Sequence, residues 1–445
     1  MADRYWVGGS ATWDATAGTK WAATSGGAGG ETAPTTGDNV FFDAASGAVS
    51  VALGGVGLGL LNLNTVGFTG TFTGSGTRTI GGSVTLGGGA TYSNTGTFTL
   101  NSTSPGNTIT SNGAVLDNNW TFNGAGGEWS IQDKFTTGAT RVITLTAGTL
   151  NLNNQILECG SFSSNNTNVR TIAFGTGKFV LKRNSTTIWT TSDNTNLTIT
   201  GTAVVDCTYS GASGSRTING GVTNFVTANL IDFNVTAGTD TLVFSSASTG
   251  ANFGNVNLTG FAGPISSGGS IVRFHKSLTL DVNCTPNFAS GSTVEFVGPG
   301  GTITSASTEI GTDVVFDGVN ATWTMSNAFN INSAKTLTFK NGTIKLKNGV
   351  TSSVGTFATS GTTQKFLQSS LAGSQATLSQ ASGTVNATYL TIKDINAIGG
   401  ATWNARTDLG AKDISNNTGW NFIFIGVKQI LNTIMKKILR PIIVN

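Results

Sequence analysis

In VITLTAGTLNLN, residues 142–153, apolar side chains alternate with threonine and asparagine around one glycine. A period of two turns one set of side chains toward a core and the polar set outward, which is typical of β-strands. Helical periodicity is absent before residue 423, so we predict an all-β chain of many short strands. Ten further segments show the same alternation: VTLGG (84–88), TFTLN (97–101), WTFNG (120–124), FVLKR (179–183), LTITG (197–201), LVFSS (242–246), SLTLD (277–281), VEFVG (294–298), VVFDG (314–318) and TLTFK (336–340).

Two internal repeats suggest that these strands stack as coils. Residues 83–154 align without gaps on residues 277–348, a shift of 194 that brings Trp129 onto Trp323. The triplet Arg-Thr-Ile begins at residues 78, 170 and 216, at intervals of 92 and 46. Both intervals suggest a unit of about 23 residues, which is in the size range of one stacked repeat. The sequence therefore predicts a single-stranded, right-handed parallel β-helix, a solenoid, with end caps.

We expect four parts along the chain: an N-terminal cap at 1–46, the β-helix at 47–400, a C-terminal cap at 401–422 and a tail at 423–445. Caps are needed because the open ends of such a stack would otherwise pair with other chains. The caps contain large aromatic side chains, which we expect to plug the ends; stacking on the sugar rings of a glycan is the alternative. The tryptophans concerned are Trp6, Trp13, Trp21, Trp403 and Trp420.

Charge is scarce and unevenly placed. The 445 residues include 24 basic and 21 acidic ones, and four of the basic residues lie in the tail, which has no acid. The rest of the chain therefore carries 20 basic and 21 acidic groups, a net charge of −1. Without a basic surplus, we expect the body not to bind nucleic acid. The N-terminal residues lack the pattern of a secretory signal, so we expect synthesis in the cytoplasm without a signal peptide.

Metal and redox chemistry are not expected. Cys159, Cys207 and Cys284 are odd in number and widely spaced, which indicates buried thiols rather than a zinc site or a disulfide framework. We interpret His275 as a solvent-facing strand residue beside Lys276, not as a general base. The sequence therefore predicts no metal and no cofactor.

The acidic residues do not suggest an enzyme. Asp313 and Asp317 are four residues apart, so on an extended strand they would lie about 13 Å from each other. Glycoside hydrolases usually place their two carboxyl groups about 5–10 Å apart. We therefore expect no catalytic residues.

Both ends of the chain resemble β-helix structural and adhesion proteins of tailed bacteriophages and bacteria. The segments that carry the resemblance are RYWVGGSATWD (4–14), TSGGAGG (24–30), DNVFFDAASG (38–47), LTIKDINAIGGATWNA (390–405) and SNNTGWNF (415–422). The resemblance implies a fibre-like or decoration protein of the virion that projects from the particle and contacts host-surface glycans. Other virion proteins would be its partners, and a homotrimer is plausible by analogy. A polysaccharide-depolymerising tailspike, with a site formed between chains, and a bacterial surface adhesin stay open as alternatives.

The tail predicts an amphipathic helix of about 15 residues that ends at Pro441. Its apolar face comprises Val427, Ile430, Leu431, Ile434, Ile438 and Leu439, and its basic residues are Lys428, Lys436, Lys437 and Arg440. A helix this short is marginal in water, so we expect it to dock and to anchor the protein. Three docking places stay open: its own solenoid or another copy, a groove of another virion protein, and an anionic membrane surface.

Overall fold

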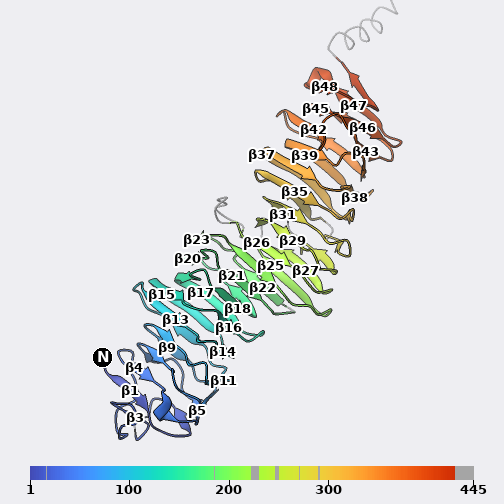
Figure 1. Cartoon of the computed structure of the whole chain (residues 1–445). Helices are drawn as coiled ribbons and strands as arrows, with labels where there is room; N and C mark the ends of the chain where they lie inside the picture. The colour runs from blue at the N-terminus through green and yellow to red at the C-terminus, as the bar shows by residue number, and fades with distance from the viewer. Residues whose placement is uncertain are drawn as a thin grey trace, which may run out of the picture. The chain divides into compact units, whose positions relative to one another are not determined.

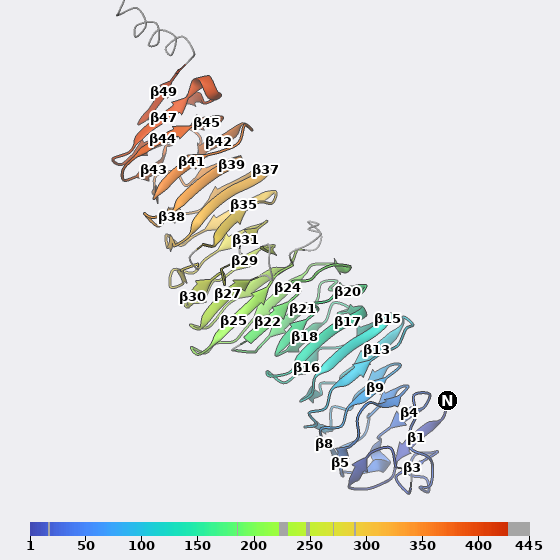
Figure 2. The same ribbon diagram turned by 180° about the vertical axis from the view of Figure 1, so that it is seen from behind.

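The computed structural model describes residues 1–16, 18–184, 186–221, 230–245, 250–269, 271–288 and 291–425. The chain forms two compact units, Met1–Phe253 and Gly254–Asn445. Each unit is a stack of short, mostly parallel strands, blue to green in Figure 1 for the first unit and yellow to red for the second. Figure 2 shows the same strands from behind.

The strands of the first unit are β1 (Asp3–Trp6), β2 (Ala11–Trp13), β3 (Trp21–Ala22), β4 (Asn39–Phe41), β5 (Ser50–Leu53), β6 (Leu58–Leu60), β7 (Leu63–Asn64), β8 (Thr71–Gly74), β9 (Arg78–Ile80), β10 (Val84–Thr85), β11 (Thr91–Tyr92), β12 (Phe98–Leu100), β13 (Asn107–Thr110), β14 (Val115–Leu116), β15 (Trp120–Ile131), β16 (Phe135–Thr137), β17 (Val142–Asn151), β18 (Ile156–Cys159), β19 (Ser161–Ser163), β20 (Arg170–Ala173), β21 (Lys178–Leu181), β22 (Thr186–Thr190), β23 (Leu197–Thr200), β24 (Val204–Cys207), β25 (Ser215–Asn219), β26 (Asp232–Val235), β27 (Thr241–Ser245) and β28 (Ala251–Phe253). A short 3-10 helix, η1 (Ala44–Ser46), follows β4.

The strands of the second unit are β29 (Val256–Asn257), β30 (Pro264–Ser266), β31 (Ile271–Phe274), β32 (Leu278–Thr279), β33 (Thr285–Pro286), β34 (Thr293–Phe296), β35 (Gly300–Thr304), β36 (Glu309–Ile310), β37 (Asp313–Met325), β38 (Asn330–Ile331), β39 (Thr336–Leu346), β40 (Thr351–Val354), β41 (Thr356–Thr359), β42 (Lys365–Ser369), β43 (Ala376–Gln380), β44 (Thr384–Ala387), β45 (Leu390–Lys393), β46 (Ile395–Ile398), β47 (Thr402–Arg406), β48 (Lys412–Ser415) and β49 (Trp420–Ile423). A second 3-10 helix, η3 (Thr407–Leu409), precedes β48.

Three strands make up one coil of the first unit. β7, β8 and β9 are the three sides of one coil, and each pairs in parallel with β10, β11 and β12 of the next. Along one side Leu63, Val84, Ile109 and Ile131 are successive partners, so the chain returns to this side once per coil. The sequence separations of these partners agree with the repeat unit predicted from the Arg-Thr-Ile triplets, and the predicted parallel solenoid is confirmed within each unit.

The apolar side chains of the alternating segments point inward and fill the core of each coil. Ile80, Leu100, Phe122 and Leu145 are partners on successive strands, and none of the four is exposed to solvent. Burying one such side chain stabilises the fold by about 1.5–3 kcal/mol. The threonine and asparagine residues between them point outward, as the period of two predicts.

The predicted duplication of residues 83–154 at 277–348 has a structural counterpart. β15 pairs with β17 through Trp120 and Ile143, and β37 pairs with β39 through Val314 and Leu337, which are the equivalent positions of the second stretch. Both pairings are interrupted directly after a phenylalanine, Phe122 in one unit and its equivalent Phe316 in the other. The two stretches therefore share strand register as well as sequence.

A glycine is required beside each of these interruptions. Gly148 and Gly342 have φ values of 84° and 90°, in the region that favours glycine. A Cβ atom would lie 2.2 Å from the Gly124 carbonyl oxygen in the first case and 2.6 Å from the Gly318 carbonyl oxygen in the second. The glycine of the stretch at residues 142–153 is thus explained by the close approach of the preceding coil.

All the strand segments expected from alternation overlap strands of the structure. Within the described residues the only helical segments are η1 and η3, and no helix there is long and apolar enough to span a membrane. The predicted tail helix falls on residues 426–445, outside the described residues. The boundaries at residues 46, 400 and 422 stay predictions.

Candidate functional site

The N-terminal tryptophans form a buried plug. Trp6, Trp13 and Trp21 are 0%, 2% and 0% exposed and surround Phe42, with ring centroids 5.3–6.0 Å from it. Trp6 and Trp21 meet edge to face at 5.1 Å, one of the arrangements that aromatic pairs prefer. These rings have no exposed face, so their surface is used for packing, as expected for a plug, and none of them is open for the alternative of stacking on a sugar.

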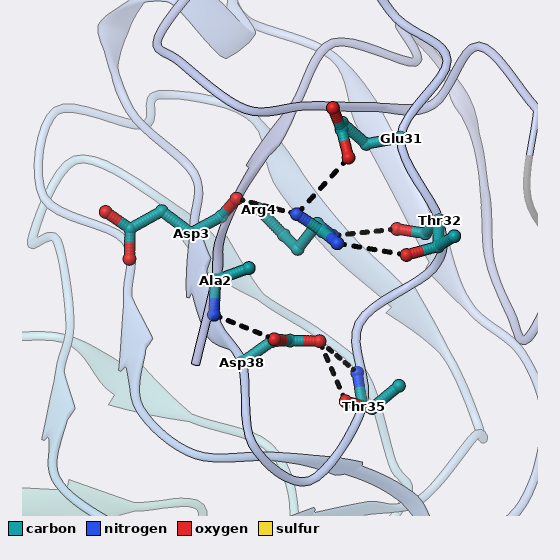
Figure 3. A network of polar contacts seen from close by, with 7 residues as sticks. All are labelled: Ala2, Asp3, Arg4, Glu31, Thr32, Thr35 and Asp38. Atoms are coloured by element: carbon teal, nitrogen blue, oxygen red, sulfur yellow. Dashed lines mark hydrogen bonds and ion pairs between the residues drawn. The ribbon is translucent and has the colours of Figure 1, made fainter.

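A polar network fastens the first strand over this plug (Figure 3). The Asp38 carboxylate accepts hydrogen bonds from the backbone N–H of Ala2 at 2.9 Å and from the backbone and hydroxyl of Thr35 at 3.0 and 2.8 Å. Burial alone would raise the pKa of Asp38, but these hydrogen bonds outweigh it and lower the pKa. Arg4 donates to the carbonyl and hydroxyl oxygens of Thr32 and pairs with Glu31 at 3.4 Å. The network holds β1 against β4.

Two half-exposed aromatic side chains lie on the outward face of this strand pair. Tyr5 and Phe41 are register partners on β1 and β4, and their rings stack with centroids 4.6 Å apart and planes 12° apart. Burial is the largest cause of a raised pKa at Tyr5, followed by the negative charges of Asp3 and Asp43, so the phenol stays protonated. No hydrogen bond involves the Tyr5 hydroxyl within the described residues. Tyr5 is therefore a free donor and acceptor beside an apolar platform.

A row of hydrogen-bonded polar side chains runs beside the two rings. The Asn39 amide donates to the Asp3 carboxylate at 2.8 Å, and the Asn62 amide donates to the Asn39 side-chain oxygen at 2.8 Å. The Asn62 side-chain oxygen then accepts the Ser83 backbone N–H. This row crosses β1, β4 and the starts of β7 and β10, at the spacing of about 4.8 Å between neighbouring strands.

The C-terminal tryptophans also pack inward. Trp403 and Trp420 are 2% and 9% exposed and meet at 5.1 Å, so they too have no open face for a sugar. Outside them the last coil is uncovered within the described part of the chain. Four apolar side chains are exposed by 37% to 67%: Leu409, Ile414, Phe424 and Ile425.

The last strands also leave open edges. β48 is paired with β45 on one side and β49 with β47 on one side, and their other edges have no strand partner within the described residues. All four residues of β48 are exposed. Open parallel edges with apolar neighbours are a surface that proteins usually cover.

The arginines of the Arg-Thr-Ile triplets are buried, which sequence reasoning missed. Arg78, Arg170 and Arg216 are at most 1% exposed. The Arg78 guanidinium lies 4.1 Å from the Trp13 ring centroid and donates to three carbonyl oxygens. Arg170 donates to four carbonyl oxygens, those of Asn168 and Ser164 just before it and those of Asp193 and Thr195 one coil further along. Arg216 pairs with Asp240. The only feature of the sequence that pointed to these arginines was their recurrence before Thr-Ile. It indicated a structural repeat but not that the arginine side chains are buried.

The carboxylates of the described residues are engaged in structural contacts. Glu158 pairs with Lys134 at 2.9 Å and with Lys182. Burial would raise its pKa, but the two ammonium groups lower it. Asp313 accepts a hydrogen bond from the backbone N–H of Thr336. Asp317 pairs with Lys340 and also accepts a hydrogen bond from the side-chain amide of Asn341. A carboxyl group that acts as a general acid needs a raised pKa. Six carboxyl groups have a shifted pKa, and in each of them the pKa is lowered: Asp14, Asp38, Glu158, Asp281, Asp394 and Asp408.

His275 is not the solvent-facing residue we expected. It is 5% exposed, and burial followed by the charge of Arg273 lowers its pKa to about 4. The residue directly follows β31, so strand alternation no longer decides which way its side chain points. Cys159, Cys207 and Cys284 are free and buried as predicted, and burial raises the pKa of each thiol.

No group of three or more His, Cys, Asp or Glu side chains that could hold a metal ion occurs among the described residues. The predicted anchoring residues lie beyond Ile425 and so outside the described part: Val427, Lys428, Ile430, Leu431, Ile434, Lys436, Lys437, Ile438, Leu439 and Arg440. Their role stays a prediction.

Comparisons with protein-family models, with curated proteins and with solved structures find no match for this chain.

Proposed function

We propose that this chain is a structural protein of a bacteriophage particle, fibre-like or decorating, whose solenoid surface contacts carbohydrate on the host. The observation that supports the proposal best is the outward face of β1, β4, β7 and β10, where Tyr5 and Phe41 lie beside the row of Asn39 and Asn62. The solenoid supplies a stiff support, and its outward Thr, Ser and Asn side chains supply neutral hydrogen-bonding groups.

The chemistry of this face suits a neutral sugar chain. A pyranose ring presents C–H groups on one face, which pack on aromatic rings, and hydroxyl groups at its edge, which both donate and accept hydrogen bonds. Tyr5 and Phe41 offer the apolar contact, and the free Tyr5 hydroxyl and the amides offer the polar one. After burial, the negative charges of Asp3 and Asp43 are the causes of the raised pKa of Tyr5, and they would repel an acidic sugar.

Saturation-transfer NMR with cellohexaose, maltohexaose and chitohexaose tests this role, with polygalacturonate as an acidic comparison. The full chain should give saturation transfer to at least one neutral oligosaccharide and not to polygalacturonate. Tyr5→Ala and Phe41→Leu should each weaken binding by about fivefold or more, the value of one aromatic contact. Phe366→Leu is the matched control, because Phe366 is an outward ring that is 43% exposed in the second unit.

Absence of transfer to all three neutral oligosaccharides, or equal binding by the Tyr5 and Phe41 variants, would contradict the glycan role. The depolymerase alternative predicts a different result, since the viscosity of a host polysaccharide would then fall steadily in the presence of the protein. The surface-adhesin alternative predicts that the chain is found in the bacterial envelope instead of in particles. Sedimentation of the same sample reports whether the chain is a homotrimer.

A further inference from the structure

We infer that a sugar chain bound to the first unit lies across its strands, over one outward column of side chains, and that it is a straight, neutral, β-1,4-linked chain. The column is called the track below and consists of Tyr5, Phe41, Asn64, Thr85 and Thr110. This placement rests on the proposed function, to which it adds the kind of chain and the residues that the chain contacts beyond the aromatic pair.

The track crosses five neighbouring strands. Tyr5 on β1 is the register partner of Phe41 on β4, and Phe41 is the partner of Asn64 on β7. Thr85 on β10 and Thr110 on β13 continue the same line of partners. The register is unbroken in all four of these described pairings. With about 4.8 Å between neighbouring strands, the five side chains extend over about 19 Å.

The side chains of the track face outward. Each of its three polar members directly follows a core residue that is at most 4% exposed, namely Leu63, Val84 or Ile109. Because side chains alternate along a strand, the polar member faces the solvent. All five residues of the track are half-buried, so each of them keeps part of its surface open.

The polar groups of the track are available to a ligand. The Asn64 side-chain oxygen accepts the Val66 backbone N–H at 2.9 Å, which fixes the side chain and leaves its amide N–H groups unused. The hydroxyl groups of Thr85 and Thr110 make no hydrogen bond within the described residues, and a hydroxyl can both donate and accept. In the row of amides described above, by contrast, neighbouring side chains use these groups on one another.

The length of the track is limited at both ends. On β3 the partner of Tyr5 is Ala22, which is 0% exposed and has no polar side-chain group. Beyond Thr110 the next residue in line is Gln132, whose side-chain amide donates to the Ser130 carbonyl oxygen at 3.0 Å and so folds back on its own strand. The unused polar groups and the two rings therefore lie between β1 and β13.

A straight column of evenly spaced groups suits a straight sugar chain. A β-1,4-linked chain of glucose or N-acetylglucosamine is an extended ribbon that advances by roughly one strand spacing per sugar, whereas an α-1,4-linked glucose chain coils. Laid across the strands, the ribbon would place about four to five sugars over the track. One sugar would pack on the aromatic pair, and the polar groups of the others would meet Asn64, Thr85 and Thr110.

Titration calorimetry of the full chain with cello- and chito-oligosaccharides of two to six sugars tests the track. In at least one series the dissociation constant should fall by about tenfold or more from two sugars to five, and by less than about twofold from five to six. Thr85→Val and Thr110→Val remove a hydroxyl and keep the shape, so each should weaken binding of the pentasaccharide by about two- to tenfold, the value of one hydrogen bond. Thr110→Val should leave binding of the disaccharide unchanged.

Thr99→Val is the matched control. Thr99 is an outward threonine of β12, on another side of the coil, where it pairs with Thr79 and Thr121. Its hydroxyl likewise makes no hydrogen bond within the described part of the chain. This variant should bind the pentasaccharide as the parent does.

A pentasaccharide with a photoreactive diazirine at its reducing end reports the direction of the bound chain. Mass spectrometry should find the cross-links at an end of the track, in the peptide that contains Tyr5 or the one that contains Thr110. Cross-links confined to the residues that flank Phe41 on its own strand would overturn the placement, as would equally tight binding of maltopentaose. If Tyr5→Ala weakens binding while Thr85→Val and Thr110→Val do not, the track is refuted and the sugar contact of the proposed function stands. If no neutral oligosaccharide binds, both are refuted.

Discussion

Removing the carboxylate of Asp240 should unfold the first unit more readily than removing any exposed acid of the chain. The Arg216 guanidinium donates to both carboxylate oxygens of Asp240, from Nε at 2.8 Å and from Nη2 at 2.7 Å. Both side chains are 0% exposed. Asp240→Leu would leave a buried positive charge whose remaining contacts include the Ala237 carbonyl oxygen and the Tyr209 ring.

Breaking a buried, hydrogen-bonded ion pair by removing one partner costs about 3–5 kcal/mol. For a unit of this size, 1 kcal/mol shifts the melting temperature by about 2–4 °C, so Asp240→Leu should lower it by roughly 10 °C. Arg216→Met should have a similar cost. The double variant Arg216→Met with Asp240→Leu should be no less stable than either single one, because no unpaired charge is left.

Urea unfolding of the four proteins, followed by tryptophan fluorescence, measures this cycle. Asp317→Ala is the matched control, since Asp317 pairs with Lys340 at 3.4 Å and both side chains are about a third exposed or more. That variant should change the free energy of unfolding by less than about 1 kcal/mol. If Asp240→Leu cost no more than the control, or if the two single costs simply added in the double variant, the assignment of these groups as a coupled buried pair would be refuted.

Three further predictions follow from matched positions and buried groups. In urea unfolding, Trp129→Phe should lower the free energy of unfolding by about 1 kcal/mol more than Trp323→Phe does. The Trp129 indole donates to the Gly82 carbonyl oxygen at 3.1 Å, whereas the Trp323 indole N–H has no partner among the described residues. Equal losses in the two variants would contradict this. The pKa of His275 is lowered to about 4, so its contribution to stability is complete above pH 6.5 and is lost as the pH falls from 6.5 toward 4. His275→Gln should therefore flatten the fall in unfolding free energy between pH 7 and pH 4.5, by about 1–3 kcal/mol, and an unchanged slope would count against burial of the imidazole. The thiols of Cys159, Cys207 and Cys284 should not react with Ellman's reagent at pH 8 until the protein is unfolded in urea, and a thiol that titrates in the native protein would contradict its burial.

The alternation of apolar and polar residues and the internal duplication predicted most of the fold. Both can be seen in the sequence itself, because in a parallel solenoid the apolar residues of each strand face the core and the polar residues face the solvent. The repeat even extends to hydrogen bonds that no sequence pattern names. Ser83 accepts the Thr108 backbone N–H at 3.0 Å, and at the equivalent positions of the second stretch Ser277 accepts the Thr302 backbone N–H at 3.1 Å.

The errors have physical reasons of their own. Arginine is usually exposed, so the sequence did not indicate that Arg78, Arg170 and Arg216 are buried. In the structure, backbone carbonyl oxygens accept from Arg78 and Arg170, and the Asp240 carboxylate accepts from Arg216. His275 lies just past a strand end, where alternation stops being informative. Tyr5 and Phe41 are far apart in the sequence, and only the pairing of β1 with β4 brings their rings together.

The cap tryptophans could not be separated into packing and binding roles by sequence, since both uses need large aromatic rings near a chain end. Burial decides between them in the structure. Each of the five tryptophans is at most 9% exposed. We therefore assign sugar contact to a more exposed neighbour on the same strand, Tyr5 beside Trp6.

Immunoelectron microscopy of phage particles, with an antibody raised against the first unit, asks whether the chain is part of the virion. We expect label on the particles, and we expect it to be lost when the antibody is first absorbed with purified protein. Label confined to the bacterial envelope, or to soluble protein with bare particles, would contradict a role as a structural protein of the virion.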